Sequence, residues 1–323
     1  MPTLPPSSSE LAAWRTVLSE HLPFSPLDYV PGMSLAGDRQ VFAEQLTAPL
    51  PEGDELRFAT PLPGGGPVAV FAQRLAWDSR FFGYGVARLD GVFPLEAPFL
   101  HFEADYTPAV EQLLERARQH AVRYLFAVVD PRDVALLRAL GGLGFALIET
   151  RIHYHLGVQI VHYVRTPDHL PQGFMGFRLA RREDIPSLSE VARQAVNPYD
   201  RFHADPFIAR ADVDRLMETW VEQSVIGQFA DLTVVPDVAE PRAMITYRLH
   251  QQHWARWGVN LVQVVLSVVA PEALGWFAVV GPELGRHLRS QGAQHCYGKT
   301  QITLGLDSSM QFGRGEHVLR IVL

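Results

Sequence analysis

Residues 197–206 bring together side chains that could bind and deprotonate a polar ligand. Tyr199, Arg201 and His203 stand close together in this segment. Arginine suits phosphate groups, tyrosine and histidine suit hydroxyl groups, and histidine titrates near neutral pH, so it can act as a base. The segment therefore predicts a substrate-binding role for all three residues and a catalytic role for His203. A solvated loop held by local Asx turns is the alternative interpretation.

A second candidate site lies where an expected strand meets an expected helix. The run 261–269 is apolar and rich in β-branched residues, which predicts a central strand. Apolar residues then recur at helical spacing up to Gly292, where a helix would stop. A short strand over 294–302 completes a strand–helix–strand unit. In open α/β sheets the helix N-terminus at the carboxyl end of such a strand binds anions.

The turn between this strand and helix resembles that of the GCN5-related N-acetyltransferase (GNAT) superfamily. In that family Val-x-Pro-Glu is followed by Arg-Gly-x-Gly-x-Gly or Ala, and backbone N–H groups hold the pyrophosphate of coenzyme A. This chain reads Val269-Ala270-Pro271-Glu272-Ala273-Leu274-Gly275-Trp276-Phe277-Ala278-Val279. The resemblance implies acetyl-CoA as co-substrate, with the strand near Leu266 to Val268 polarising the thioester carbonyl. The implied cofactor-binding residues are Leu266, Val268, Val269, Gly275, Trp276 and Phe277.

Three positions of the turn depart from the family pattern, and Pro282 follows in the expected helix. Leu274 stands in place of Arg or Gln, and Phe277 and Val279 stand where glycines let the backbone approach phosphate. Proline favours the first helical position, so Pro282 predicts a helix that starts several residues beyond the turn. We therefore expect acetyl-CoA to bind weakly, if at all.

The N-terminal half carries a resemblance of its own. The words Leu75-Ala76-Trp77-Asp78-Ser79-Arg80-Phe81-Phe82-Gly83 and Gly144-Phe145-Ala146-Leu147-Ile148-Glu149-Thr150-Arg151 resemble the truncated first domain of dTDP-fucosamine acetyltransferase-like proteins. The predicted fold is mixed α/β, with two GNAT-like domains, each a mixed twisted sheet flanked by helices. The predicted parts are a helical extension and linker over 1–67, a truncated domain over 68–166, and an acyltransferase domain over 174–323. The strand over 261–269 should diverge from the strand that ends near Thr300, as pantetheine entry requires.

The same family suggests where the general acid and the acceptor site would lie. Its acid is a tyrosine about eleven positions after a Thr-Gln strand end, and that position here is Gln311, which cannot donate a proton to a thiolate. Tyr297 is the nearest replacement, with a core or edge tyrosine as the alternative. The family builds its acceptor site at the segment 197–206, and Tyr247 completes the predicted substrate-binding set.

Composition and charge narrow the class of protein. The chain has 323 residues, 47% of them hydrophobic, and a net charge of -7, so no basic field favours nucleic acid or anionic lipid. The single cysteine, Cys296, reads as a buried core thiol and excludes an intrachain disulfide. His153 and His155 face the same way on an expected strand, but no third ligand is specified, so no metal is predicted. No apolar run reaches the length of a membrane span, and we expect a cytoplasmic protein without membrane partners.

The favoured function is acyl-CoA-dependent N-acetylation of a small polar acceptor, and the resemblance implies a nucleotide-linked amino sugar. A rival hypothesis is a non-catalytic GNAT-fold binding or scaffolding protein that has lost acetyl-CoA binding. A third is transfer from an aminoacyl-tRNA, which the charge of -7 disfavours. The acyl group, the acceptor and the oligomeric state, including a homodimer, stay open.

Overall fold

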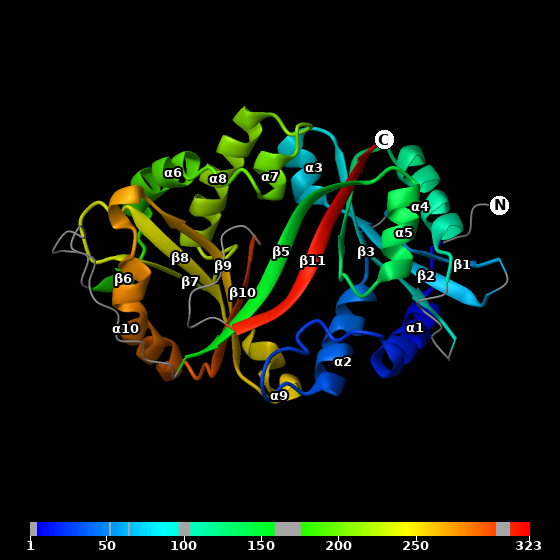
Figure 1. The fold of residues 1–323 in the computed structure, drawn as a ribbon, viewed down its shortest axis with the longest axis horizontal. Coiled ribbons are helices and arrows are strands. Elements are labelled where there is room, and N and C mark those ends of the chain that lie inside the picture. The colour runs from blue at the N-terminus through cyan, green and yellow to red at the C-terminus, as the bar shows by residue number, and fades with distance from the viewer. Residues whose placement is uncertain (1–4, 52, 64, 97–103, 159–175, 302–310) are drawn as a thin grey trace. The chain divides into compact units, whose positions relative to one another are not determined.

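The computed structural model describes residues 5–51, 53–63, 65–96, 104–158, 176–301 and 311–323 (Figure 1). The chain divides into two compact units, Met1–Arg151 with Gly315–Leu323, and Ile152–Arg314. The predicted linker at 167–173 lies outside the described residues. The last nine residues belong to the unit that contains the N-terminus, so the chain ends in the unit where it began.

The first unit has two N-terminal helices followed by an α/β arrangement. Its helices are α1 (Ser8–His21), α2 (Leu35–Leu46), α3 (Ala76–Phe82), α4 (Thr107–Gln119) and α5 (Val134–Gly142). Its strands are β1 (Phe58–Pro61), β2 (Pro67–Arg74), β3 (Gly85–Pro94), β4 (Val122–Val129), the start of β5 (Ala146–Gly157) and most of β11 (Gln311–Val322). A capping box between Ser7 and Glu10 starts α1, and its buried face packs against β2 and β3 through Trp14 and Phe71, whose ring centroids lie 5.8 Å apart.

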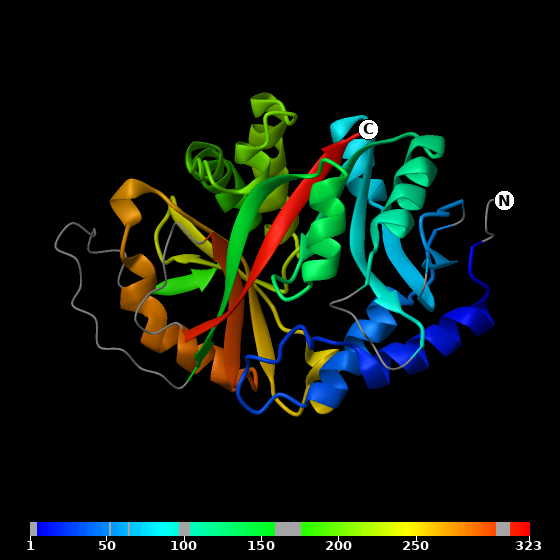
Figure 2. The same ribbon diagram turned by 45° about the vertical axis from the view of Figure 1, so that its right-hand side comes forward.

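The second unit carries the strand–helix–strand segment. Its helices are α6 (Ile185–Gln194), α7 (Arg201–Ala204), α8 (Arg210–Val225), α9 (Trp254–Trp257) and α10 (Trp276–Ser290), with 3₁₀ turns at Arg182–Asp184, Gln251–His253 and Pro271–Ala273. Its strands are β6 (Phe177–Leu179), β7 (Leu232–Pro236), β8 (Ala243–Arg248), β9 (Leu261–Val269) and β10 (His295–Gln301). Figures 1 and 2 show α6 and α8 on one face of these strands and α10 on the other.

The core of the second unit explains the position of α10. Val280, Leu284 and Leu288 recur at helical spacing on its buried side and pack against Val262 and Cys296 of β9 and β10. Burial raises the pKa of the Cys296 thiol to about 12, so this group stays protonated and unreactive. The prediction of a buried core cysteine is confirmed.

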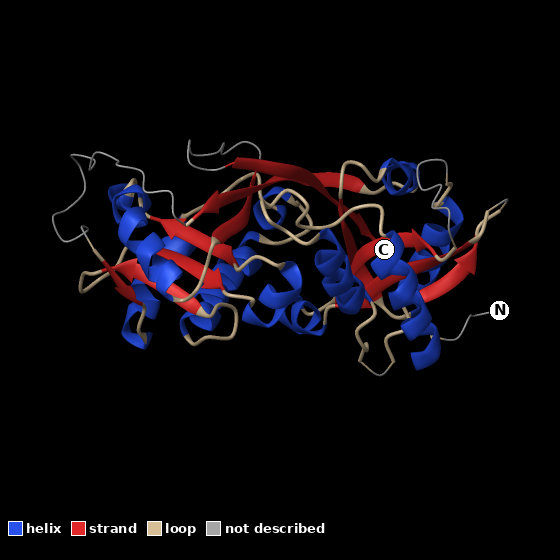
Figure 3. Cartoon of the chain, turned by 90° about the horizontal axis from the view of Figure 1, so that it is seen from below, coloured by secondary structure: helices blue, strands red, loops and turns tan. Residues whose placement is uncertain are grey.

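The described strands follow one hydrogen-bonded order, β1-β2-β3-β4-β11-β5-β10-β9-β8-β7-β6. The pairs β3–β4 and β9–β10 are parallel, whereas β4–β11 and β8–β9 are antiparallel, so the sheet is mixed. Figure 3 shows these strands in red among helices in blue. The mixed α/β class is confirmed. The expectation of a separate sheet for each domain is wrong, because the long strands β5 and β11 continue the hydrogen bonding from β4 to β10.

Two short helices of the first unit lie among proline, glycine and aromatic residues. The proline- and glycine-rich stretch 23–67, part of the expected helical extension and linker, contains α2, which Ser34 caps by accepting the N–H of Gly37. The aromatic-rich word at 75–83 contains the short helix α3, which Gly83 ends with a positive φ of 75°. No helix in the described part of the chain is long and apolar enough to cross a membrane.

Candidate active site at the divergence of β9 and β10

The two parallel strands β9 and β10 are paired over three residues only. The pairs are Leu261–His295, Val262–Cys296 and Gln263–Tyr297, after which β9 runs on to Val269 and β10 to Gln301 without continuing this pairing. The predicted divergence is therefore confirmed. From Val264 onward, no residue that the structure describes pairs with the side of β9 that faced β10. We call this side the open edge of β9; unpaired main-chain groups on such an edge can recruit an extended partner.

A bulge in β9 lies just beyond the last pair. The antiparallel register with β8 passes from Tyr247–Val264 to Thr246–Leu266, so Val265 is an extra residue. The hydroxyl of Thr246 replaces the interrupted main-chain hydrogen bonds. It accepts the N–H of Leu266 at 2.9 Å and donates to the C=O of Leu266 at 3.2 Å. The main chain of Leu266 is thus turned toward β8.

The direction of the next main-chain groups follows from strand alternation. The N–H of Ala270 also points to β8, where it donates to the C=O of Arg242 at 2.9 Å. Because alternate residues of a strand direct their N–H groups to opposite sides, Ser267 and Val269 present theirs to the open edge. Of the predicted contacts Leu266, Val268 and Val269, only Val269 has its N–H on that edge, and Ser267, which sequence reasoning missed, joins it.

The helix α10 begins directly after the turn that resembles the pyrophosphate loop. Gly275 precedes it with a φ of 88°, a left-handed conformation that favours glycine. The expectation that Pro282 starts the helix is wrong, because Trp276 is its first residue and Pro282 lies inside it. The Ala278 and Val279 N–H groups bond to the C=O of Gly275. In the described part of the chain no acceptor meets the N–H groups of Trp276 and Phe277, as expected for the first turn of a helix.

The side chains of this turn are divided between core and solvent. Trp276 is 0% exposed, and its indole N–H donates to the C=O of Gly176 at 3.3 Å. Phe277 packs beside it, with ring centroids 4.9 Å apart. Leu274 is 55% exposed, at the position where the pattern of the resembling family has Arg or Gln. Trp276 therefore acts as an anchor for the turn. Leu274 contributes no positive charge, and the nearby Arg242 is paired with Glu272 at 2.9 Å.

Tyr297 lies at the last residue pair before the strands separate. Its hydroxyl is 3.3 Å from Nε2 of His250, and the same nitrogen is 2.9 Å from Oε1 of Gln263. His250 has a positive φ of 53°, uncommon for a residue with a Cβ. Burial lowers the pKa of His250 despite the opposing hydrogen bond with Gln263, so this imidazole is neutral at pH 7. Sequence reasoning missed His250, because nothing in the sequence marks its contact with two other strands.

The position where the family carries its acid is on a strand in this chain. Gln311 is the first residue of β11, and the neighbouring Phe312 is 61% exposed. Residues 302–310, which precede Gln311 in the chain, lie outside the described residues. Tyr297 therefore stays the predicted acid, now with a histidine hydrogen-bonded to its hydroxyl.

The loop 197–206 reaches the far end of β10. Nδ2 of Asn197 donates to Oε1 of Gln301 at 2.6 Å. Asp200 caps α7 through the N–H groups of Phe202 and His203, and its other oxygen is 2.6 Å from Nδ1 of His203. This Asp–His pair fixes the orientation of the imidazole, as a base requires.

The predicted acceptor residues differ in their exposure. Tyr199 is 51% exposed, whereas the His203 side chain is only 4% exposed and Arg201 is buried with its guanidinium 4.4 Å from the ring centroid of Phe202. Tyr247 lies in the core beneath β9, where burial raises the pKa of its phenol well above the ordinary value. Of the four side chains, Tyr199 is thus the most exposed.

The two histidines expected on one face of a strand are both buried. His153 and His155 lie on β5, and the ring of His155 is 6.1 Å from that of His295. His162 lies outside the described residues. Among the residues that the structure describes, no three His, Cys, Asp or Glu side chains are grouped as metal ligands.

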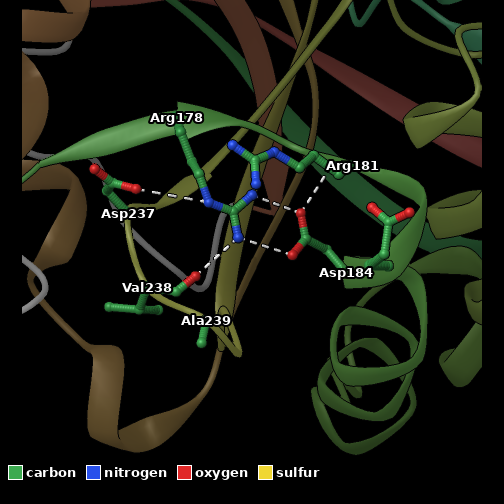
Figure 4. A pocket seen from close by; sticks show the side chains of 7 residues that line it. Arg178, Arg181, Asp184, Asp237, Val238 and Ala239 are labelled. Atoms are coloured by element: carbon green, nitrogen blue, oxygen red, sulfur yellow. Dashed lines mark hydrogen bonds and ion pairs between the residues drawn. The ribbon is translucent and has the colours of Figure 1, made fainter.

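A cavity of about 470 Å³ lies at the β6 edge of the second unit, away from the diverging strands. Figure 4 shows Arg178 within it, between two carboxylates. The guanidinium donates to both oxygens of Asp184, at 2.7 and 2.8 Å, and to the C=O of Val238, while Asp237 lies 3.7 Å away. With its donors used in this way, Arg178 joins β6 to the segments that follow it.

Replacing Asp184 with Ala is expected to lower the free energy of unfolding by about 3 kcal/mol, because it leaves the Arg178 charge without its bidentate partner. The value is at the low end of the range for a buried pair because the Arg178 side chain is 15% exposed. Urea unfolding checks it, with Asp237→Ala as control. Asp237 is exposed, so that variant should change stability by less than about 1 kcal/mol. Equal losses in the two variants would contradict the assignment.

The same pair predicts a pH dependence. Burial alone would raise the pKa of Asp184, but hydrogen bonds from Arg178 and the Arg181 N–H outweigh it and hold that pKa below its ordinary value. The stabilisation is then complete above the unfolded pKa of about 4 and is lost as pH falls below it. The difference in Tm between the unsubstituted chain and Asp184→Ala should be constant from about pH 5 to 7 and shrink below about pH 4.

Two solved structures share the fold along nearly the whole chain. A GCN5-related N-acetyltransferase from Sphaerobacter thermophilus is 10% identical with a TM-score of 0.58, and the match covers 99% of this chain and 94% of that one. A tandem GNAT protein from the clavulanic acid biosynthesis pathway is 13% identical with a TM-score of 0.55, covering 100% and 97%. No protein-family model and no curated protein matches the chain. At this identity the likeness shows the fold alone, which is the fold of these GNAT structures.

Proposed function

We propose that the chain is an acyl-CoA-dependent N-acyltransferase that uses acetyl-CoA. The observation that carries the proposal is the divergence of β9 from β10 beside a bulge, with the N–H groups of Ser267 and Val269 on the open edge. An extended amide-containing ligand such as pantetheine can pair with such an edge, as a peptide adds to a sheet. The N-terminus of α10 then lies at the end of the same strand, where an anionic pyrophosphate is favoured.

The chemistry requires a base, a hydrogen-bond donor for the carbonyl oxygen, and an acid. The amine nitrogen bonds to the thioester carbon, the carbon–sulfur bond breaks, one proton leaves the amine and one reaches the thiolate. We assign the carbonyl donors to the open-edge N–H groups, the acid to Tyr297, and the base to His203, which Asp200 orients. Tyr199 is assigned to acceptor binding.

The acceptor is proposed to be a small polar amine, and a nucleotide-linked amino sugar is the example that the family resemblance implies. The loop that meets the acceptor is tied to the end of β10 by Asn197 and Gln301. The hydrogen bond between these residues supports a binding place at the wide end of the divergence rather than at its base.

Release of free coenzyme A from millimolar acetyl-CoA, followed with a thiol-reactive dye across a panel of amines, tests the proposal. The dye has little background in the protein, because Cys296 is buried and its pKa is raised. We expect release that depends on the amine and that is greatest for polar amines. Release that no amine increases would favour the non-catalytic alternative.

A further inference from the structure

The structure assigns a positioning role to Thr246: its hydroxyl holds the bulge of β9 and thereby directs the Ser267 N–H to the open edge. This inference deepens the proposed function and rests on it for the catalytic consequence. The geometry itself is independent of any ligand, because it involves two neighbouring strands of one unit.

At the bulge the main-chain hydrogen bonds between β8 and β9 are interrupted, and the side chain of Thr246 takes their place. Thr246 is 0% exposed, so water does not compete for its hydroxyl. A hydroxyl has one donor and two acceptor positions, and it can therefore satisfy both the N–H and the C=O of Leu266, at 2.9 and 3.2 Å. An aliphatic side chain could satisfy neither group.

The consequence for the open edge follows from the two-residue period of a strand. With Leu266 turned to β8, Ser267 faces away from β8. If the extra residue Val265 were drawn into the ladder, the register would shift by one residue and Ser267 would direct its N–H to β8 instead. The Thr246 hydroxyl favours the first arrangement, because a shifted register would leave Leu266 without these bonds.

Amide hydrogen exchange measured by NMR tests this role without any substrate. In Thr246→Val, which keeps the shape and removes the hydroxyl, we expect the Leu266 amide to exchange at least tenfold faster relative to other β9 amides. Thr246→Ser keeps the hydroxyl and should retain the protection. Thr233→Val is the matched control: it removes another buried hydroxyl, which donates to the C=O of Ser224 at 3.0 Å, and should leave Leu266 exchange unchanged.

Acyl transfer supplies the second readout. We expect kcat to fall at least tenfold in Thr246→Val and to recover in Thr246→Ser. Should Thr246→Val fail to fold, Thr246→Cys, whose thiol is a weak donor and acceptor, gives the same comparison. Unchanged Leu266 exchange in a folded hydroxyl-free variant overturns the role of Thr246. Absence of acyl transfer in the unsubstituted chain counts against the proposed function instead, and the exchange comparison still decides the role of Thr246.

Discussion

Replacing Leu274 with Arg, Phe277 with Gly and Val279 with Gly together should tighten the binding of acetyl-CoA by about 100-fold. Each charge-assisted hydrogen bond that the turn regains is worth roughly 1.5 to 3 kcal/mol, and about 1.4 kcal/mol corresponds to a factor of ten in affinity. The unsubstituted chain is expected to bind with a Kd in the range of roughly 0.1 to 1 mM. Calorimetric titration measures both values.

The structure makes this restoration practicable. Since α10 begins at Trp276, the N–H groups of Trp276 and Phe277 already stand at the helix start, and no shift of the helix is needed. Leu274 is exposed, so an arginine there disturbs no core packing. Phe277 packs on Trp276, however, and its loss costs stability, which a thermal melt of the variant must monitor.

Two single substitutions serve as controls for charge. Leu274→Arg alone should improve affinity by about tenfold, whereas Leu274→Glu, of similar exposure, should weaken binding further. A low-micromolar Kd in the unsubstituted chain would show that the side chains at this turn do not impair binding. A folded triple variant without detectable binding would favour the scaffolding alternative.

Replacing Ser267 with Pro should lower kcat for acyl transfer by about 100- to 1000-fold. Proline removes the N–H that we place on the open edge, and the loss of one preorganised donor to a developing oxyanion costs roughly this factor. The ladder with β8 is expected to survive, because the deleted N–H faces away from β8 and proline is tolerated where the N–H is unpaired.

Ser267→Ala distinguishes the contribution of the main-chain N–H to catalysis from that of the side-chain hydroxyl. It keeps the N–H and deletes the hydroxyl, so kcat should stay within about twofold of the unsubstituted value if the N–H is the donor. Circular dichroism and a thermal melt confirm that both variants fold. Full activity in a folded Ser267→Pro variant would remove this N–H from the mechanism, and a large loss in Ser267→Ala would transfer the role to the hydroxyl.

The sequence predicted β9, α10 and β10 because hydrophobic periodicity and the proline and glycine residues that end strands and helices are local signals. The β-branched run over 261–269 and the apolar spacing that ends near Gly292 predicted the strand and the helix closely. Local reasoning failed at Pro282, since packing of the flanking helix outweighs the lost bond. It did not locate α2 within the expected helical extension and linker, because tertiary contacts hold this helix despite the surrounding prolines and glycines.

The site itself could be predicted only in outline. The divergence of β9 and β10 followed from the family resemblance, but the Thr246 hydroxyl and His250 act across strands that lie far apart in sequence. Which main-chain N–H groups face the open edge, that of Ser267 rather than that of Leu266, depends on the one-residue bulge in β9. No local sequence pattern marks this bulge. The single strand order was missed because β11 returns to β4 from the other end of the chain.

Hydrogen exchange with mass spectrometry, with and without millimolar acetyl-CoA, tests the central claim most directly, because it shows both whether the donor binds and where. We predict slower exchange in peptides that cover 264–279, the open edge of β9 and the start of α10, and unchanged exchange in β6 around the Arg178 cavity. Unchanged exchange over 264–279 at saturating acetyl-CoA, or protection confined to another segment, would contradict an acyltransferase site at the divergence of β9 and β10.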